Sequence, residues 1–293
     1  MSISTSRTKS VGFIGLGAMG APMARWIASE GYVVFGYDPF PPPPDALRQV
    51  TLVPSIADLA ARTTTIICMV STPDQARDVL MSPGGAFDLL PEGATVLVMG
   101  TFGPDVVRAL DAGALTSGVR LIDAPVSGGV ARAGKGDLLI MTSARPEDAE
   151  FGEEILGTLG STVRTVGDLP GMGQVVKLVN QLLCGVHIAA AAEALALANH
   201  LGVDVRDTWE TVRRGAAASF MLADRGQRMV NEEFDDPKSA VDIFVKDMNM
   251  VAAAAAAVGM DSRVALSAAS VFEEARAAGL GRKDDSSIIT RYL

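Results

Sequence analysis

The chain has 293 residues, of which 48% are apolar and 20% charged, and its formal net charge is −9. This length favours two domains, because a single hydrophobic core stops growing at about 250–300 residues. The acidic balance, without a basic stripe interleaved with aromatic residues, argues against nucleic acid as a partner.

Other compositional features bear on the location of the protein and on disulfide and zinc sites. We find no run of about 18 apolar residues without charge, so we expect no membrane partner and a cytoplasmic location. Residues 1–10 are short, basic and rich in Ser and Thr, which is more typical of a disordered tail than of a transit peptide. The two cysteines, Cys68 and Cys184, are too few for a disulfide framework or a zinc site, and we expect both in the core.

The first part of the chain, residues 11–170, alternates short apolar strands with helical segments. Strands are predicted at 11–17, 33–38, 63–70, 94–100, 119–125, 136–142 and 161–167. Strands separated by helices predict a doubly wound parallel sheet of the Rossmann type, with helices on both faces.

From residue 171 to residue 293 the predicted strands stop and helical periodicity continues. Helices are predicted at 171–200, 205–214, 221–230, 240–258 and 264–278, with another at the C-terminus. The fold class is therefore α/β, with a Rossmann domain at 11–170 followed by an all-α domain at 171–293. We expect the long helix at 171–200 to join the two domains, and the alanine-rich stretch near residue 255 favours close helix packing within or between subunits.

A glycine-rich turn follows the first strand directly and precedes a helix. Asp38 ends the next strand about 20 residues further on, which completes the dinucleotide-binding pattern GxGxxG. In this pattern the first glycine permits the tight turn, the second lets a pyrophosphate approach, and the third allows close helix–strand contact. The turn comprises Gly15, Leu16, Gly17, Ala18, Met19 and Gly20.

The residue that ends the second strand predicts which dinucleotide binds. Asp38 can accept hydrogen bonds from both hydroxyls of an adenosine ribose, but its charge would repel a 2′-phosphate. No Arg or Lys follows before Arg48. NAD is therefore favoured over NADP as the cofactor, and no metal site is predicted.

A polar cluster interrupts the apolar start of the long helix. Lys177, Asn180 and Gln181 stand at i, i+3 and i+4 and share one helix face. Oxidation of an alcohol by a nicotinamide cofactor needs a base for the hydroxyl proton. Desolvation would lower the pKa of Lys177 and suit it to that role, but spacing alone equally allows a lysine that reaches solvent. His187 and His200 are the two histidines, and both have more ordinary structural interpretations.

Four stretches together resemble the β-hydroxyacid dehydrogenases, the family of 3-hydroxyisobutyrate dehydrogenase, which is related to 6-phosphogluconate dehydrogenase. They are "GFIGLGAMGAPMA", "DAPVSGGVARAGKGDLLIM", "GMGQVVKLVNQ" and "VDIFVKDM", and the resemblance extends over essentially the whole chain from Val11. It implies a Rossmann domain followed by a helical domain, with Lys177 as the catalytic lysine.

The resemblance also implies the roles of further residues. It places the substrate carboxylate at Ser127, Gly128 and Gly129, where successive backbone amides of a glycine-rich turn can bind an anion. From the residues alone, the same turn could be purely structural.

Two more positions match family residues near the cofactor. Thr101 matches the Ser-Thr loop beside the nicotinamide ribose, although Gly100 stands where the family usually has Ser. Lys246 matches the lysine of a Lys-Asp pair that approaches cofactor and substrate, but a helical ion pair with Asp242 is its simpler interpretation.

One departure from the family pattern concerns substrate choice. Gln181 occupies the place of an Asn that binds substrate in most members, and the surrounding string resembles the L-threonate dehydrogenase subgroup. The resemblance thus implies NAD-dependent oxidation of L-threonate at C2, with Gln181 contacting a hydroxyl and Asn180 and Ser219 lining the pocket.

Several alternatives remain open from the sequence. The substrate could be 3-hydroxyisobutyrate or tartronate semialdehyde, and a non-catalytic NAD-binding protein is a more distant possibility. We expect a homodimer or homotetramer assembled through the helical domain.

Overall fold

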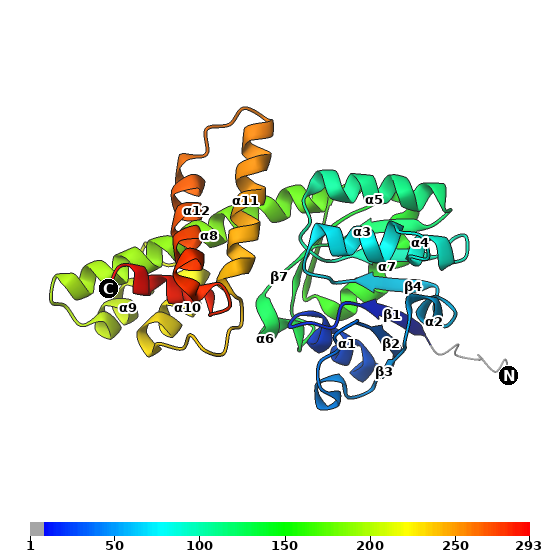
Figure 1. Cartoon of the computed structure of the whole chain (residues 1–293), viewed down its shortest axis with the longest axis horizontal. Helices are drawn as coiled ribbons and strands as arrows, with labels where there is room; N and C mark the ends of the chain where they lie inside the picture. The colour runs from blue at the N-terminus through cyan, green and yellow to red at the C-terminus, as the bar shows by residue number, and fades with distance from the viewer. Residues whose placement is uncertain (1–8) are drawn as a thin grey trace. The chain divides into compact units, whose positions relative to one another are not determined.

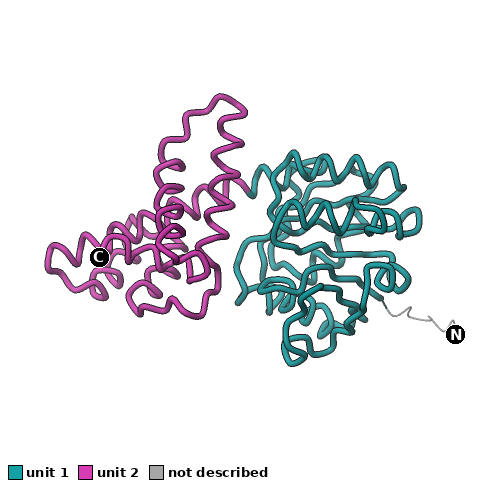
Figure 2. The backbone as a smooth tube through the Cα atoms, viewed as in Figure 1, with its two compact units in different colours: residues 1–177 teal, residues 178–293 magenta. Residues whose placement is uncertain are grey.

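The structure is a computed structural model that describes residues 9–293. The chain forms two compact units, which divide between Lys177 and Leu178 (Figure 2). Most of the tail predicted for residues 1–10 lies outside the described residues, and Ser10 already begins the first strand. The predicted fold class, a Rossmann-type sheet followed by helices, is confirmed (Figure 1).

The first unit is built on one sheet with the strand order β3-β2-β1-β4-β5-β6-β8-β7, with β9 paired to β8. Pairing is parallel from β3 to β6, which is the strand order of a dinucleotide-binding sheet. The strands are β1 (Ser10–Ile14), β2 (Val33–Tyr37), β3 (Val50–Leu52), β4 (Thr65–Cys68), β5 (Thr95–Val98), β6 (Arg120–Asp123), β7 (Val126–Ser127), β8 (Leu139–Ser143) and β9 (Thr162–Gly167).

The last strands depart from the simple parallel order. β8 runs antiparallel to β6 and β7, whereas β9 runs parallel to β8. The connection from Ser127 to Leu139 holds only one short helix, so the chain turns back beside the strand it has left. A parallel return would need a longer crossover.

Helices cover both faces of this sheet, because alternate strand residues are apolar on both sides. Phe13 packs in the core that includes residues of α1 and α7, and Ile14 packs in the core under α2, α3 and α5. The helices are α1 (Gly20–Ser29), α2 (Ile56–Ala60), α3 (Pro73–Met81), α4 (Ala86–Leu89), α5 (Pro104–Thr116), α6 (Gly129–Ala133) and α7 (Pro146–Leu159), with a 3₁₀ turn at Pro44–Leu47.

The second unit is entirely helical from Leu178 onward. Its core includes Trp209, Met248 and a stacked pair, Phe244 and Phe272, with ring centroids 5.2 Å apart. The elements are α8 (Met172–His200), which starts in the first unit, α9 (Val205–Val212), α10 (Phe220–Asn231), α11 (Val241–Ala257), α12 (Arg263–Ala275), a π turn (Arg276–Leu280) and a 3₁₀ segment (Asp285–Arg291).

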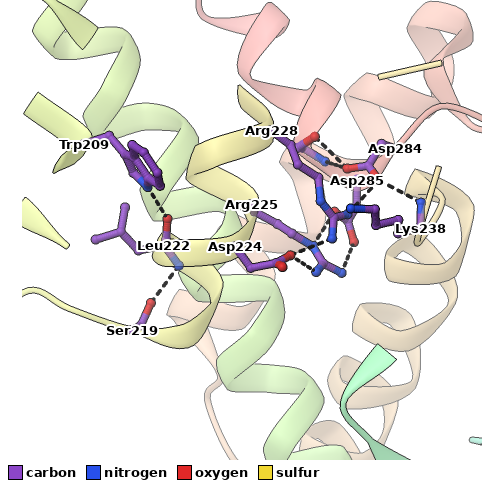
Figure 3. A network of polar contacts seen from close by, with 10 residues as sticks. Trp209, Ser219, Leu222, Asp224, Arg225, Arg228, Lys238, Asp284 and Asp285 are labelled. Carbon is purple, nitrogen blue, oxygen red and sulfur yellow. Dashed lines mark hydrogen bonds and ion pairs between the residues drawn. The ribbon is translucent and has the colours of Figure 1, made fainter. Parts of the chain in front are cut away.

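A buried ionic network holds the C-terminal segment against α10 (Figure 3). Arg225 forms a bidentate pair with Asp285, at 2.8 and 3.0 Å, and Arg228 contacts Asp284 at 2.8 Å. Asp284 also accepts a hydrogen bond from the Ser286 backbone, which favours a local turn. The helix predicted at the C-terminus is present as a 3₁₀ helix.

Within residues 9–293, α8 is the one helix long and apolar enough to cross a membrane by those two criteria. Its apolar side chains have another use, because Ile188, Ala192 and Leu195 are buried in the core of the helical unit. Half of the apolar stretch of α8 is thus buried in the structure, as in a core helix.

Candidate active site

The glycine-rich turn has the geometry that its three glycines predict. Gly15 has φ +92°, and a Cβ on it would lie 2.6 Å from the Met69 carbonyl oxygen. A Cβ on Gly20 would lie 2.0 Å from the Gly15 carbonyl oxygen, so α1 starts in close contact with the turn. A Cβ on Gly17 would meet nothing within 4 Å. Gly17 thus leaves open space beside the N-terminus of α1, where a phosphate can approach.

Asp38 closes the other side of this turn. Its carboxylate accepts hydrogen bonds from the Leu16 amide at 2.7 Å and from the Phe40 amide at 2.8 Å. Each carboxylate oxygen has a second lone pair, so both can still accept from a ribose hydroxyl. A hollow beside the turn is lined by Leu16, Gly17, Ala18, Ala21, Pro22, Arg25, Phe40, Pro42, Ala46 and Val130.

The loop that carries Thr101 follows β5 at the carboxyl edge of the sheet, the edge where ligands bind in this architecture. A Cβ on Gly100 would lie 2.2 Å from the Phe102 ring, which is 2% exposed. Gly100 stands where the family usually has Ser because the buried Phe102 ring leaves no room for a side chain there.

Asp123, at the end of β6, anchors the start of α8. Its Oδ2 accepts hydrogen bonds from the backbone amides of Gly171 at 2.9 Å and Gln174 at 3.1 Å, and from the Ser143 hydroxyl at 3.1 Å. Burial raises the pKa of Asp123 to about 6, although these hydrogen bonds and one from the Gln174 side chain oppose the shift. Gly171 and Gly173 are needed here, because Gly171 has φ +102° and a Cβ on Gly173 would lie 2.5 Å from the Met141 carbonyl oxygen.

Lys177 lies one turn beyond this anchor on α8, within the first unit. The residue is 6% exposed, so the structure does not fit a lysine that simply extends into solvent. Lys177 is therefore a buried lysine on a helix turn whose start is held by Asp123.

The Ser-Gly-Gly turn begins at Ser127, the last residue of β7, in the same unit. Gly128 has φ +141° and Gly129 has φ +73°, conformations that other residues rarely adopt. A Cβ on Gly129 would meet nothing within 4 Å, so its backbone is open to a ligand. The turn can present successive amides to an anion.

In the helical unit, Gln181 on α8 contacts α11. Gln181 is 7% exposed and donates a short hydrogen bond to Asp247, and its oxygen accepts from Asn180 at 2.9 Å. Lys246 lies 3.1 Å from the second oxygen of Asp247. Gln181 is therefore held by Asn180 and Asp247, and the Lys-Asp pair is an ion pair between neighbours.

Two other candidate residues have structural partners. Ser219 caps α10 by accepting a hydrogen bond from the Leu222 amide at 3.0 Å (Figure 3). His200 contacts the Tyr292 carbonyl at 2.8 Å, which agrees with its structural interpretation. Cys68 is buried, as expected, and burial raises the pKa of its thiol to about 12, whereas Cys184 is half-buried.

Family models match both parts of the chain. Residues 10–167 match the NAD-binding domain of 6-phosphogluconate dehydrogenase, and residues 171–292 match a domain described as NAD-binding of NADP-dependent 3-hydroxyisobutyrate dehydrogenase. The chain belongs to the β-hydroxyacid dehydrogenase family. It is a nicotinamide-dependent hydroxyacid dehydrogenase, so the predicted family and enzyme class are confirmed.

The relatives of this dehydrogenase are named after different substrates. L-threonate dehydrogenase of Cupriavidus necator is 36% identical over 284 residues, which cover 96% of this chain and 95% of that protein. 2-(Hydroxymethyl)glutarate dehydrogenase of Eubacterium barkeri is 30% identical over 289 residues, which cover 95% of this chain and 93% of that protein. The crystal structure of 3-hydroxyisobutyrate dehydrogenase from Salmonella typhimurium has a TM-score of 0.89 at 34% identity, covering 96% and 99%.

Three polar residues of this dehydrogenase were missed by the sequence reasoning. Asp123 and Gln174 are fully buried, and Asp247 is 2% exposed. Their positions held signals: Asp123 ends a strand just before the Ser-Gly-Gly turn, Gln174 precedes Lys177 by three residues, and Asp247 follows Lys246. A buried polar group needs partners, and those partners are visible only in the folded chain.

Proposed function

We propose that this dehydrogenase oxidises L-threonate at C2 to the 2-oxo acid, with NAD as cofactor and Lys177 as the general base. The observation that carries the proposal is the burial of Lys177, 6% exposed, one turn after the helix start that Asp123 anchors. A neutral amine there can accept the hydroxyl proton. When bound at the glycine-rich turn, the nicotinamide cofactor supplies the hydride acceptor.

The other residues hold the substrate in this proposal. Backbone amides at Gly128 and Gly129, with the Ser127 hydroxyl, bind the carboxylate of the acid. Thr101 lies by the nicotinamide ribose, and Lys246 contributes positive charge toward cofactor and substrate. Gln181 retains one amide hydrogen and one lone pair beyond its bonds to Asp247 and Asn180, so it can still contact a substrate hydroxyl.

L-threonate is favoured by the relatives of that name at 32–36% identity over nearly the full chain. The alternative is 3-hydroxyisobutyrate, because a solved structure of that name is 34% identical with a TM-score of 0.89. NAD is favoured over NADP because Asp38 places a carboxylate, itself bonded to the Leu16 amide, where the adenosine ribose would lie.

A substrate panel tests the proposal. Purified protein is given L-threonate, D-threonate, 3-hydroxyisobutyrate and glycerate, the alcohol whose oxidation gives tartronate semialdehyde, each with NAD and with NADP, and reduced nicotinamide is followed by absorbance. We expect the highest kcat/KM for L-threonate with NAD. A higher kcat/KM for 3-hydroxyisobutyrate would show that this acid, and not L-threonate, is the substrate. No formation of reduced nicotinamide with any acid would contradict the proposal.

We also propose that the chain assembles as a homodimer or homotetramer through the helical unit. Large apolar side chains are exposed around the turn between α11 and α12, where Val258 is 78%, Met260 57% and Val264 64% exposed. Apolar groups clustered in this way are typical of an interface. Light scattering of the purified protein should give a mass at least twice that of one chain.

A further inference from the structure

One buried glutamine side chain links the helix turn of Lys177 to the loop of Thr101. The Oε1 atom of Gln174 accepts hydrogen bonds from the amides of Phe102 at 2.9 Å and Gly103 at 3.1 Å. Its Nε2 donates to the Gly100 carbonyl at 3.1 Å. Gln174 thus holds backbone groups on both sides of Thr101, from a position three residues before Lys177.

Asp123 determines which way this amide points. Its Oδ1 accepts a 2.9 Å hydrogen bond from Nε2 of Gln174. Because an ionised carboxylate only accepts, Nε2 must face Asp123 and Oε1 must face the two loop amides. A flipped amide would place Nε2 against the N–H groups of Phe102 and Gly103. The carboxylate therefore selects the one amide orientation that holds the loop.

The same carboxylate fixes the helix that carries Lys177. The second oxygen of Asp123 accepts from the amides of Gly171 and Gln174 and from the Ser143 hydroxyl, and that hydroxyl accepts from the Gly173 amide at 2.8 Å. Asp123 thus binds backbone amides of the residues where α8 starts. One buried group controls both the helix turn and, through Gln174, the loop.

Gln174 cannot also bind substrate. Its two amide hydrogens go to Gly100 and Asp123, and its oxygen accepts twice, so every hydrogen-bonding position of the side chain is occupied. Any influence on the reaction must therefore act through the groups it holds.

We propose that Asp123 and Gln174 are positioning residues, which hold the Lys177 turn and the Thr101 loop in the mutual arrangement that hydride and proton transfer require. This inference rests on the function proposed above for Lys177. Misplacement of reacting groups by about 1 Å can cost about 100-fold in rate, so loss of the pair should lower kcat much more than it weakens NAD binding.

A double-mutant cycle tests the pair. In Asp123→Asn, the single amide oxygen can accept either from the helix amides or from Nε2 of Gln174, so one of these two contacts is lost. Gln174→Glu places two carboxylates together, so the bond between the pair is lost there as well. In the double variant, the amide at position 123 can keep its oxygen toward the helix amides and donate to the carboxylate at position 174, whose other oxygen still accepts from Phe102 and Gly103. The bond to the Gly100 carbonyl stays lost, so the recovery is partial. We expect each single variant to lose about 100-fold in kcat, and the double variant to recover about tenfold relative to either.

Two further variants separate positioning from general loss of stability. Gln174→Met keeps the side-chain length, adds no charge and removes the hydrogen bonds of the amide, so its kcat should also fall. It provides the test if the Asp123→Asn and Gln174→Glu single variants do not fold. The control is Asp111→Asn, which breaks the paired 2.6 Å hydrogen bonds between Asp111 and Arg145 in the same unit without touching Gln174. It should melt earlier with kcat unchanged.

The measurements are kcat with saturating NAD and the acid that wild type oxidises best, the NAD dissociation constant, and the melting temperature, with Lys177→Ala run in parallel. A folded Gln174→Met variant with wild-type kcat, or a double variant no better than the worse single, would overturn the positioning role. Normal turnover by Lys177→Ala would instead overturn the proposed function. The two failures are thus distinguishable.

Discussion

The side-chain amide of Gln174 donates a 2.9 Å hydrogen bond to the carboxylate of Asp123, and both residues are fully buried. Burial raises the pKa of Asp123 to about 6 even though four hydrogen bonds stabilise its charged form. The protein therefore retains a costly ionisable group at this place. Asp123 holds the start of α8 directly and the Thr101 loop through Gln174, and these two elements carry the proposed reaction.

The raised pKa of Asp123 predicts how stability varies with pH. The folded pKa of about 6 exceeds the ordinary value of 3.8, so the folded state binds this proton more tightly than the unfolded state. The stabilising contribution is fully present below the ordinary pKa and is lost as the pH rises through the folded one. The shift corresponds to about 3 kcal/mol.

Denaturant unfolding of wild type and Asp123→Asn at several pH values between 4 and 7 checks this prediction. Other carboxyl groups contribute equally to both proteins and cancel in the difference. The free energy of unfolding of wild type, relative to the variant, should fall by up to about 3 kcal/mol as the pH rises. A difference that does not change with pH would show that Asp123 titrates normally.

The glycine-rich turn predicts opposite outcomes for two substitutions. Gly17→Val places its side chain in open space, so the fold should be retained, but the side chain occupies the approach to the pyrophosphate. We expect NAD affinity to fall at least about tenfold, which corresponds to 1.4 kcal/mol, with an unchanged melting temperature. Gly20→Ala instead brings a Cβ within 2.0 Å of the Gly15 carbonyl oxygen and should destabilise the unit.

Calorimetric NAD titration and thermal melting of both variants separate these outcomes. If the Gly17→Val protein binds NAD as tightly as wild type, the cofactor does not bind at this turn. A Gly20→Ala protein as stable as wild type would contradict the close helix contact.

The substitution Gln181→Asn tests the residue that departs from the common family pattern. The shorter side chain withdraws the amide from Asp247, to which Gln181 donates, and shifts the donor offered to a substrate hydroxyl. We expect kcat/KM for L-threonate to fall by about tenfold or more, since one misplaced hydrogen bond costs about 1–2 kcal/mol. Activity on 3-hydroxyisobutyrate should fall less.

Steady-state kinetics on both acids give the ratio that decides this. An equal loss on the two substrates would mean that Gln181 has only a structural role through Asp247. An unchanged ratio and unchanged rates would remove it from substrate selection altogether.

The sequence predicted the Rossmann half well, because its signals are local. Gly15, Gly17 and Gly20 each have the geometry that the motif requires, and the strand ending at Asp38 brings its carboxylate to the turn. Periodicity also predicted the helices of the second unit. The reversal of β8 and β9 was missed, since a run of apolar residues carries no information about strand direction.

The buried polar contacts could not be predicted for a different reason. Asp123 and Gln174 are 51 positions apart in the sequence, and Gln181 and Asp247 are 66 apart. Such pairs depend on how β6, α8 and α11 pack, and no local pattern encodes that packing. Lys177 was identified as a candidate from spacing, but its burial and the anchoring of its helix turn required the structure.

The most direct test of the proposed mechanism is turnover by Lys177→Ala, measured with L-threonate and NAD alongside an NAD titration. Because loss of a general base typically costs about 100- to 10,000-fold, we predict that kcat collapses by at least about 100-fold while NAD affinity and folding are retained. A folded Lys177→Ala protein that oxidises L-threonate at the wild-type rate would contradict the assignment of Lys177 as the proton acceptor.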